Sequence, residues 1–457
     1  MGRTGRVAMP LKALARRFAL AFCSVFALAA VTDAETLNYG FDAGLGESDN
    51  IGLVPAHKVS QTIATADVDF DVKHQSRRLD VDAKGDFTFL DYLQGAYGSQ
   101  VLGRFDGVAH VALIPQRLTW VLQDDFGQAA LDPFTPTTPS NVESINYVST
   151  GPDLALRVGG AGFVDAGLRV ARAQYATSPF NSNRVLGSFA AGLQLSARSS
   201  VSLNALAERV LFDDTNINSN FNRTTGFVHY EVHGARTDLS ADLGATHVSQ
   251  TAASTTGPHA RLAVARKLSP AATVTLSGGR ELTDASTSFS GLQSGAIGVV
   301  GTAPAVLTAN SYTDNFASVG WQYLRGRTSV GVTGRWEKDV YASQPQLDLT
   351  RGSAEFSVER KLTRALSAQL FGRYSKYDYV HATNLVPLNG SSSYSDRLIA
   401  AVVKWRHGRA LEVRLRFEHT SRTTTGTNNG FQENRAFLTI GYRPGPQGTH
   451  EIPGGNP

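Results

Sequence analysis

The sequence predicts an all-β protein, a transmembrane antiparallel up-and-down β-barrel of about 20 strands, with about 18 as the alternative. Three observations lead to this fold class: segments that alternate apolar and polar residues along the chain, short and long connections that alternate between them, and an N-terminal secretion signal. Residues 410–419 show the alternation best, since Leu411, Val413, Leu415 and Phe417 share one face while Glu412, Arg414, Arg416 and Glu418 share the other.

The first three strands form the start of an up-and-down sheet. Residues 36–45 alternate Leu37, Tyr39 and Phe41 with polar residues, and residues 64–72 and 79–89 do the same around a turn at residues 74–76. The remaining strands are predicted at residues 103–114, 117–126, 145–158, 162–175, 184–197, 201–212, 224–233, 236–248, 259–267, 272–283, 312–324, 327–341, 349–360, 365–379, 394–406, 409–422 and 434–443.

Nine short turns join these strands into hairpins, and longer connections such as residues 128–141 and 213–220 lie between the hairpins. Bacterial barrels have short periplasmic turns and long outer loops, so the sequence predicts both chain ends in the periplasm. Arg172, Arg266 and Arg280 break the alternation, which indicates either a β-bulge or a position at the membrane interface.

The first 34 residues are typical of a secretory signal peptide. A basic stretch ends at Arg17, an apolar run covers residues 18–30, and small residues lead to Ala34, where we expect cleavage, with Ala29 as the second choice. The barrel then covers residues 35–443, and residues 444–457 are expected to be a flexible periplasmic tail. We therefore expect export to the outer membrane of a Gram-negative bacterium.

Charge excludes one class of partner. Five basic residues and one acid lie within the first 34 residues, so the remainder holds 38 basic and 38 acidic residues, although the whole chain carries +4. A neutral chain has no electrostatic footprint for nucleic acid. The only cysteine, Cys23, falls inside the signal, so no disulfide is expected.

We find no motif for catalysis, a cofactor or a metal. The chain lacks a GxSxG nucleophile elbow, a Walker loop, HExxH and CxxC. Asp67, Asp69 and Asp71 have a spacing that occurs in calcium loops, but they lie inside a predicted strand without the glycine and distal glutamate of such a loop. The sequence therefore predicts a protein that is not an enzyme and has no cofactor.

Two features are candidates for function. The first is charge sorting on the inner face of the barrel, which places an acidic and a basic sector on either side of the seam between the first and last strands. The functional interpretation is a transverse field that orients polar solutes, and the alternative is internal ion pairing. These sectors contain Asp42, Asp67, Asp69, Asp71, Asp80, Asp82, Asp86, Arg373, Lys404, Arg406, Glu412, Arg414, Arg416 and Glu418.

The second feature is the uncharged stretch from Ala285 to Tyr312, which contains Phe289, Val306 and Leu307. Connections of this length are usually functional or disordered. It is either a gate folded into or over the pore or, as we expect, a capping loop or a hairpin that extends above the membrane.

The opening residues 36–52, with Ser48-Asp49-Asn50, the turn segment 361–367 and the terminal segment 437–442 resemble a Gram-negative outer-membrane family. These porin-like barrels are associated with exosortase/PEP-CTERM and exopolysaccharide gene clusters. The resemblance implies a passage or scaffold in exopolysaccharide export, with outer-membrane lipid, the barrel assembly machinery, polysaccharide and export proteins as partners. The alternatives are a general diffusion porin for small polar solutes and a closed structural or adhesive barrel that acts through its outer loops.

Overall fold

The computed structural model describes residues 36–250, 254–291, 306–379, 381, 392–425 and 430–444. The predicted signal peptide lies outside the described residues, and so does the predicted tail beyond Pro444. Both therefore stay predictions.

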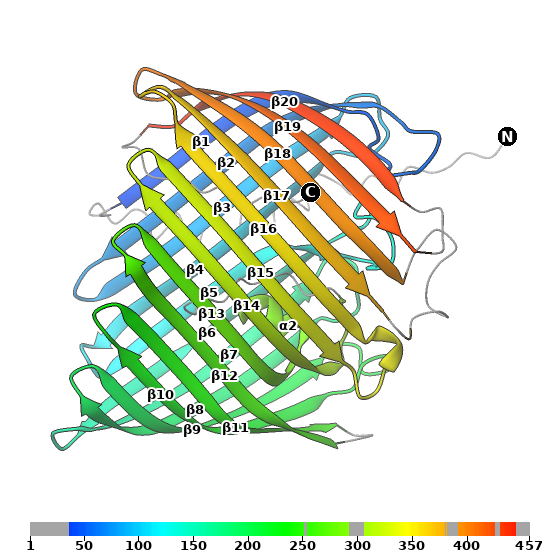
Figure 1. The fold of residues 1–457 in the computed structure, drawn as a ribbon. Helices are drawn as coiled ribbons and strands as arrows, with labels where there is room; N and C mark the ends of the chain where they lie inside the picture. The colour runs from blue at the N-terminus through cyan, green and yellow to red at the C-terminus, as the bar shows by residue number, and fades with distance from the viewer. Residues whose placement is uncertain are drawn as a thin grey trace.

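The described chain is almost entirely β-structure (Figure 1). Its strands are Thr36–Ser48 (β1), Gln61–Gln75 (β2), Leu79–Tyr92 (β3), Gln100–Ile114 (β4), Leu118–Ala130 (β5), Val142–Val158 (β6), Gly162–Tyr175 (β7), Ser182–Ser196 (β8), Ser199–Phe212 (β9), Phe221–His233 (β10), Thr237–Gln250 (β11), Ser254–Ser269 (β12), Ala272–Asp284 (β13), Ser311–Arg325 (β14), Thr328–Val340 (β15), Leu349–Lys361 (β16), Leu366–Asp378 (β17), Ser393–His407 (β18), Leu411–Thr424 (β19) and Phe431–Tyr442 (β20).

Each strand pairs antiparallel with the next, and β20 pairs with β1 to close the barrel. The closing register runs from Phe41 opposite Tyr442 to Ser48 opposite Arg435. Closure leaves no strand edge, so every strand can satisfy its backbone amides inside lipid. The predicted up-and-down barrel of 20 strands is confirmed, and the alternative of 18 is wrong.

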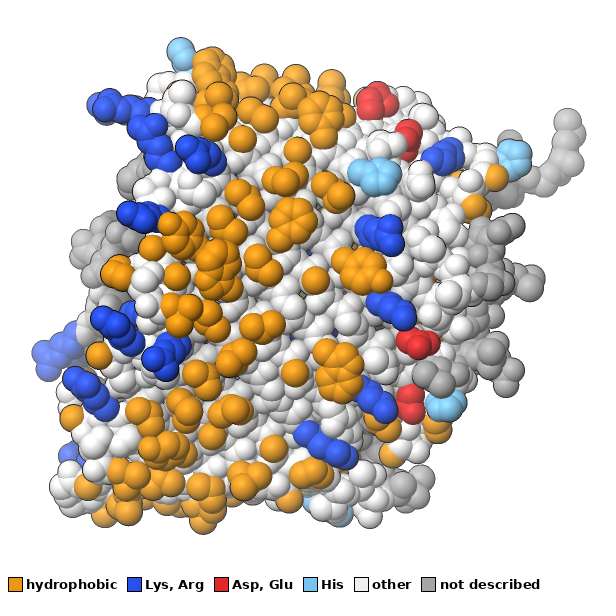
Figure 2. All heavy atoms as spheres, viewed as in Figure 1, with side chains coloured by type: hydrophobic (Ala, Val, Ile, Leu, Met, Phe, Trp, Pro, Cys, Tyr) orange, Lys and Arg blue, Asp and Glu red, His pale blue; other side chains and the backbone are white. Residues whose placement is uncertain are grey.

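The predicted strand parity matches the two faces of the barrel wall. Phe41 and Leu45 are exposed on β1, whereas Asp42 between them is 5% exposed. The same alternation places the large hydrophobic residues of the other strands on the outside. Figure 2 shows this belt of hydrophobic side chains, with basic groups at both of its borders. An apolar belt bordered by charge is the outer surface that a bilayer requires.

Of the three arginines that interrupt the pattern, Arg266 lies beside a β-bulge, whereas Arg172 and Arg280 do not. The register shifts between Ala112 and Ile114, between Gln194 and Ser196, and between Lys267 and Ser269. Pairing is regular at Arg172 and Arg280, which both lie within four residues of a strand end. The interface interpretation therefore fits these two arginines, and the bulge interpretation is wrong for them.

The described chain contains two short helical segments, Ala285–Gly291 (α2) and the 3-10 turn Pro345–Leu347 (η1). Among the described residues, no helix is long and apolar enough to span a membrane. α2 follows β13 directly and lies within the outline of the barrel (Figure 1). The connection predicted at residues 213–220 is confirmed, and the one predicted to begin at residue 128 begins at Leu131, because β5 continues to Ala130.

Candidate functional site: the barrel interior and its mouth

The two predicted charge sectors meet at the β1–β20 seam. Arg443, just beyond β20, has an ion pair with Asp42 of β1 and reaches Asp69 of β2 with an Nη2 to Oδ1 distance of 2.5 Å. Arg414 lies 3.8 Å from Asp42 and 3.0 Å from Glu412. The seam is therefore joined by a network of ion pairs as well as by backbone hydrogen bonds.

Two glycines beside this network leave room for its side chains, because they have no Cβ atom. A Cβ atom at Gly441 would lie 1.6 Å from Oδ1 of Asp42, and one at Gly40 would lie 2.8 Å from Nη1 of Arg443. Since side chains cannot approach so closely, glycine at these two positions allows the guanidinium group to lie against the wall.

The structure places the other predicted sector residues in several local arrangements. Asp67 lies opposite Asp42 and accepts a hydrogen bond of 2.5 Å from Thr88, while Asp86 lies opposite Asp69. Arg416 pairs with Glu418, as Arg373 does with Glu355 on β16 at 2.5 Å. On the acidic side, Asp71 faces Lys84, Asp82 pairs with Lys73 at 3.3 Å, and Asp80 is exposed at the short-turn end. On the basic side, Lys404 faces Arg414, and Arg406 donates a hydrogen bond to the carbonyl oxygen of Arg443.

The described ends of the uncharged connection, residues 285–291 and 306–310, lie against the inner wall, and we call them the insert. Phe289 and Leu307 pack in one cluster with Ile145 of β6 and Tyr175 of β7. Val306 packs in a second cluster with Leu349 of β16 and Tyr379 beyond β17. The insert therefore contacts walls that lie far apart around the barrel.

A second segment enters the same end of the barrel. Phe134, in the connection after β5, packs against Val306 and stacks edge-on with Tyr379, with 5.0 Å between the ring centres. The Tyr394 hydroxyl donates to the carbonyl oxygen of Pro133 at 2.8 Å. This connection thus reaches across to β17 and β18, and both segments occupy the end that carries the long connections.

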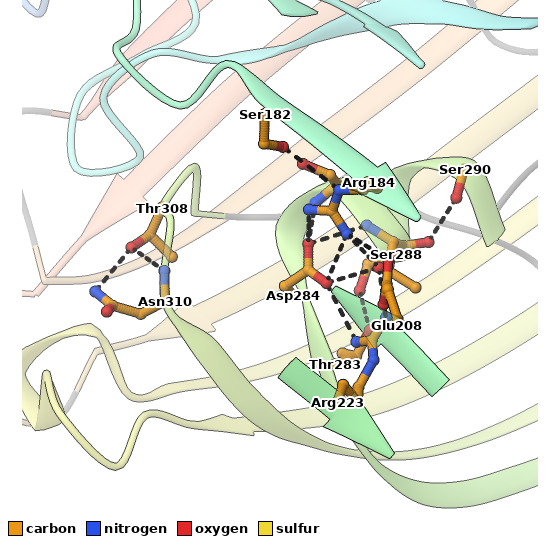
Figure 3. Close-up of polar contacts among 12 residues, drawn as sticks. Ser182, Arg184, Glu208, Arg223, Thr283, Asp284, Ser288, Ser290, Thr308 and Asn310 are labelled. Atoms are coloured by element: carbon orange, nitrogen blue, oxygen red, sulfur yellow. Dashed lines mark hydrogen bonds and ion pairs between the residues drawn. The ribbon is translucent and has the colours of Figure 1, made fainter. Parts of the chain in front are cut away.

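A buried ion-pair cluster fixes the start of the insert (Figure 3). Asp284 ends β13 and accepts hydrogen bonds from Arg184 of β8, at 2.6 and 3.2 Å, and from Arg223 of β10, at 3.2 Å. Glu208 of β9 pairs with both arginines. The Arg184 and Asp284 side chains are 1% and 3% exposed.

Side chains of α2 extend this attachment. Thr287 receives hydrogen bonds from Arg184 at 3.1 Å and Arg223 at 2.9 Å, and donates to Asp284 at 2.6 Å. Ser286 and Tyr175 share a hydrogen bond of 2.8 Å. The insert is thus held by polar contacts at its first turn and by apolar contacts further along. Sequence reasoning missed all four residues of this cluster. Arg184 and Glu208 lie on predicted strands, Arg223 lies one residue before one, and Asp284 borders the uncharged stretch.

Two carboxylates outside the strands, Asp49 and Asp213, attach long connections to the barrel wall at this end. Asp49 accepts hydrogen bonds from the backbone and side-chain amides of Asn434, at 2.8 and 2.7 Å. Partial burial alone would raise the pKa of Asp49, but these hydrogen bonds hold it below its ordinary value. Bonding to Arg172 likewise lowers the pKa of Asp213. Both groups are therefore ionised at neutral pH, and they bond the connections after β1 and β9 to residues of β20 and β7.

One group among the described residues has the chemistry of a metal site. Asp314, Glu337 and Asp339 place carboxylate oxygens within 4.8 Å of one another, near the start of β14 and the end of β15, away from the short turn between these strands. The sequence did not predict this group, because its members lie on two strands.

No protein-family model matches the chain, and no curated protein matches its sequence. Solved structures do match its fold. The FrpB iron transporter from Neisseria meningitidis is 10% identical with a TM-score of 0.45, over 90% of this chain and 83% of that one. A mutant ferric enterobactin receptor, PfeA, from Pseudomonas aeruginosa is 10% identical with a TM-score of 0.48, over 90% and 81%.

OccK2 from Pseudomonas aeruginosa, solved in complex with glucuronate, is 10% identical with a TM-score of 0.37, over 90% of this chain and 99% of that one. At this identity no residue of these proteins can be assigned to a position in this chain. The narrower resemblance to exosortase-associated barrels stays a prediction.

Proposed function

We propose that this protein is a passive, non-catalytic passage through the outer membrane for polar carbohydrate, in the service of exopolysaccharide export. The observation that carries the proposal is the interior of the closed barrel. Its wall is polar and charged, and the described crossing segments lie only at the end with long connections. Barrels of 16–18 strands leave an aqueous channel, and 20 strands give a wider interior.

The insert acts as the constriction of this passage. It contacts β6 and β7 through Phe289 and Leu307, and the β16–β18 side through Val306. A polymer that leaves the barrel at this end must pass beside it. The polymer class rests on the resemblance of the sequence to barrels of exopolysaccharide loci.

Single-channel conductance of the refolded protein in a planar bilayer tests this proposal. We expect a steady conductance that oligosaccharides reduce, with longer chains blocking more than monosaccharides. Equal effects of sugars and other small solutes would favour a general diffusion porin instead.

A matched pair of deletions tests the constriction. Replacing residues 286–310 by a short glycine-serine linker should raise the conductance, whereas shortening the connection at residues 214–219 should leave it unchanged. A folded native barrel that conducts no current would contradict the passage and favour a closed scaffold or adhesin.

A further inference from the structure

Two aspartates face each other on adjacent strands near the mouth of the barrel. Asp314 of β14 and Asp339 of β15 are direct partners in the strand register. Like charges directly opposite each other on a sheet are destabilising. Glu337 lies two residues before Asp339, so it projects from the same face of β15.

Arginines neutralise only part of this charge. Arg351 contacts both Glu337 oxygens at 2.7 Å, and Nε of Arg335 contacts Oε2 of Glu337 at 2.8 Å. Arg335 reaches Asp314 only at 4.0 Å. Among the described residues, no basic group lies within ion-pair distance of Asp339.

Asp339 is nevertheless buried. It is 3% exposed and Asp314 is 9% exposed, and within the described chain Oδ1 of each has no hydrogen-bond partner. Burying an ionised carboxylate without a partner carries a large free-energy cost. Each aspartate thus has one oxygen without a hydrogen-bond partner in the described chain, within a group whose ligand oxygens lie within 4.8 Å of one another.

The neighbouring strand adds another carboxylate with its own arginine. Glu281 of β13 lies opposite Asp314 and pairs with Arg261 at 3.3 Å. The group therefore has four carboxylates and three guanidinium groups, which leaves one negative charge without a counterion. Asp339 is the member of the group that has no basic partner among the described residues.

We propose that Asp314 and Asp339 bind a divalent cation of the calcium type. Oxygen ligands are those that Ca²⁺ prefers, and its flexible coordination allows water to complete a site with few protein ligands. Glu337 is occupied by arginines, so it sets the local charge and is not a ligand. Since ligand charge count sets affinity, two carboxylates predict a weak site suited to the calcium concentrations outside cells.

The bound cation would tie the insert to the wall. Tyr312 precedes Asp314 by two residues. Its ring is tilted against that of Tyr341, with 4.9 Å between the ring centres, and its hydroxyl shares a hydrogen bond of 2.8 Å with Ser288 of α2. A cation that joins β14 to β15 beside this tyrosine pair would stabilise the position of α2.

Terbium luminescence tests the site, because Tyr312 and Tyr341 flank it and sensitise bound Tb³⁺. The refolded full-length barrel in detergent should show terbium emission upon tyrosine excitation, and millimolar Ca²⁺ should displace it. Asp339→Asn and Asp314→Asn should lose this emission. The control Asp80→Asn, an exposed residue at the short-turn end, should retain it.

Thermal unfolding gives a second readout. Calcium should raise the Tm of the native barrel and of Asp80→Asn, but not that of Asp339→Asn. In EDTA, Asp339→Asn should melt at or above the native temperature, since it removes an unpaired buried charge. The site is disproved if the folded native barrel shows no calcium-displaceable emission, or if Asp339→Asn retains both the emission and the calcium-dependent Tm.

Discussion

Arg443 shows how one residue can govern closure of the whole sheet. It follows the last strand, yet its guanidinium group contacts Asp42 on the first strand and Asp69 on the second. Its backbone amide also donates to Ala410 at 2.7 Å, at the turn before β19. One residue therefore links both sides of the seam, where pairing of β20 with β1 closes the barrel.

Arg443→Ala should destabilise the folded barrel by about 3–5 kcal/mol, because it leaves Asp69 without an ion-pair partner among the described residues and leaves Asp42 with only Arg414, at 3.8 Å. Denaturant unfolding in lipid vesicles, followed by tryptophan fluorescence, measures this loss. Arg409→Ala, an exposed arginine in the turn at the same end, is the control and should change stability little.

Gly441→Ala should weaken the same contact without removing a charge, since its Cβ would collide with Asp42. Native-like stability in both Arg443→Ala and Gly441→Ala would show that the ion pairs at the seam are dispensable.

At the scale of elements, strand parity and strand number were predictable from the sequence, because alternation is a local property of each segment. Strand ends were less predictable. β1 continues to Ser48, three residues beyond its predicted end, through Gly46 and Glu47. Pairing with β2 and β20 extends this strand, and those partners lie far away in the sequence.

The contacts of the insert were not predictable for the same reason. Arg184 and Asp284 are separated by 100 residues, and Arg443 and Asp42 by 401. The sequence identifies an uncharged connection but does not say whether it turns inward. The structure places its described ends against the wall, which fits a gate or a capping loop better than a hairpin that extends above the membrane.

Asp284→Asn should loosen the insert, because Arg184 and Arg223 then share Glu208 as their only carboxylate within the described cluster. We expect a higher mean conductance with more current fluctuation than in the native protein. Asp213→Asn removes a carboxylate from an outer connection and should leave the current unchanged. An Asp284→Asn trace indistinguishable from the native trace would mean that the apolar contacts alone hold the insert.

For the whole molecule, the distribution of paired and unpaired charge decides which ions the wall favours. Arg373, Arg414 and Arg416 each pair with a carboxylate, whereas Lys404 and Arg406 have no ion pair within the described residues. Asp67 and Asp86 have no ion pair within the described residues, and they lie on adjacent strands of the same wall. The transverse field stays a prediction, and the described ion pairs leave most of the basic sector paired beside an acidic wall with unpaired carboxylates.

This asymmetry predicts a moderate preference for cations, which substitutions should shift in opposite directions. Asp67→Asn with Asp86→Asn should move the reversal potential in a potassium chloride gradient toward that of a non-selective pore. Arg414→Ala with Arg416→Ala should move it the other way, because Glu418 loses its partner and Glu412 keeps only Arg443, at 3.8 Å. Reversal potentials that stay fixed in both double variants would show that ions are selected at the insert and not along the wall.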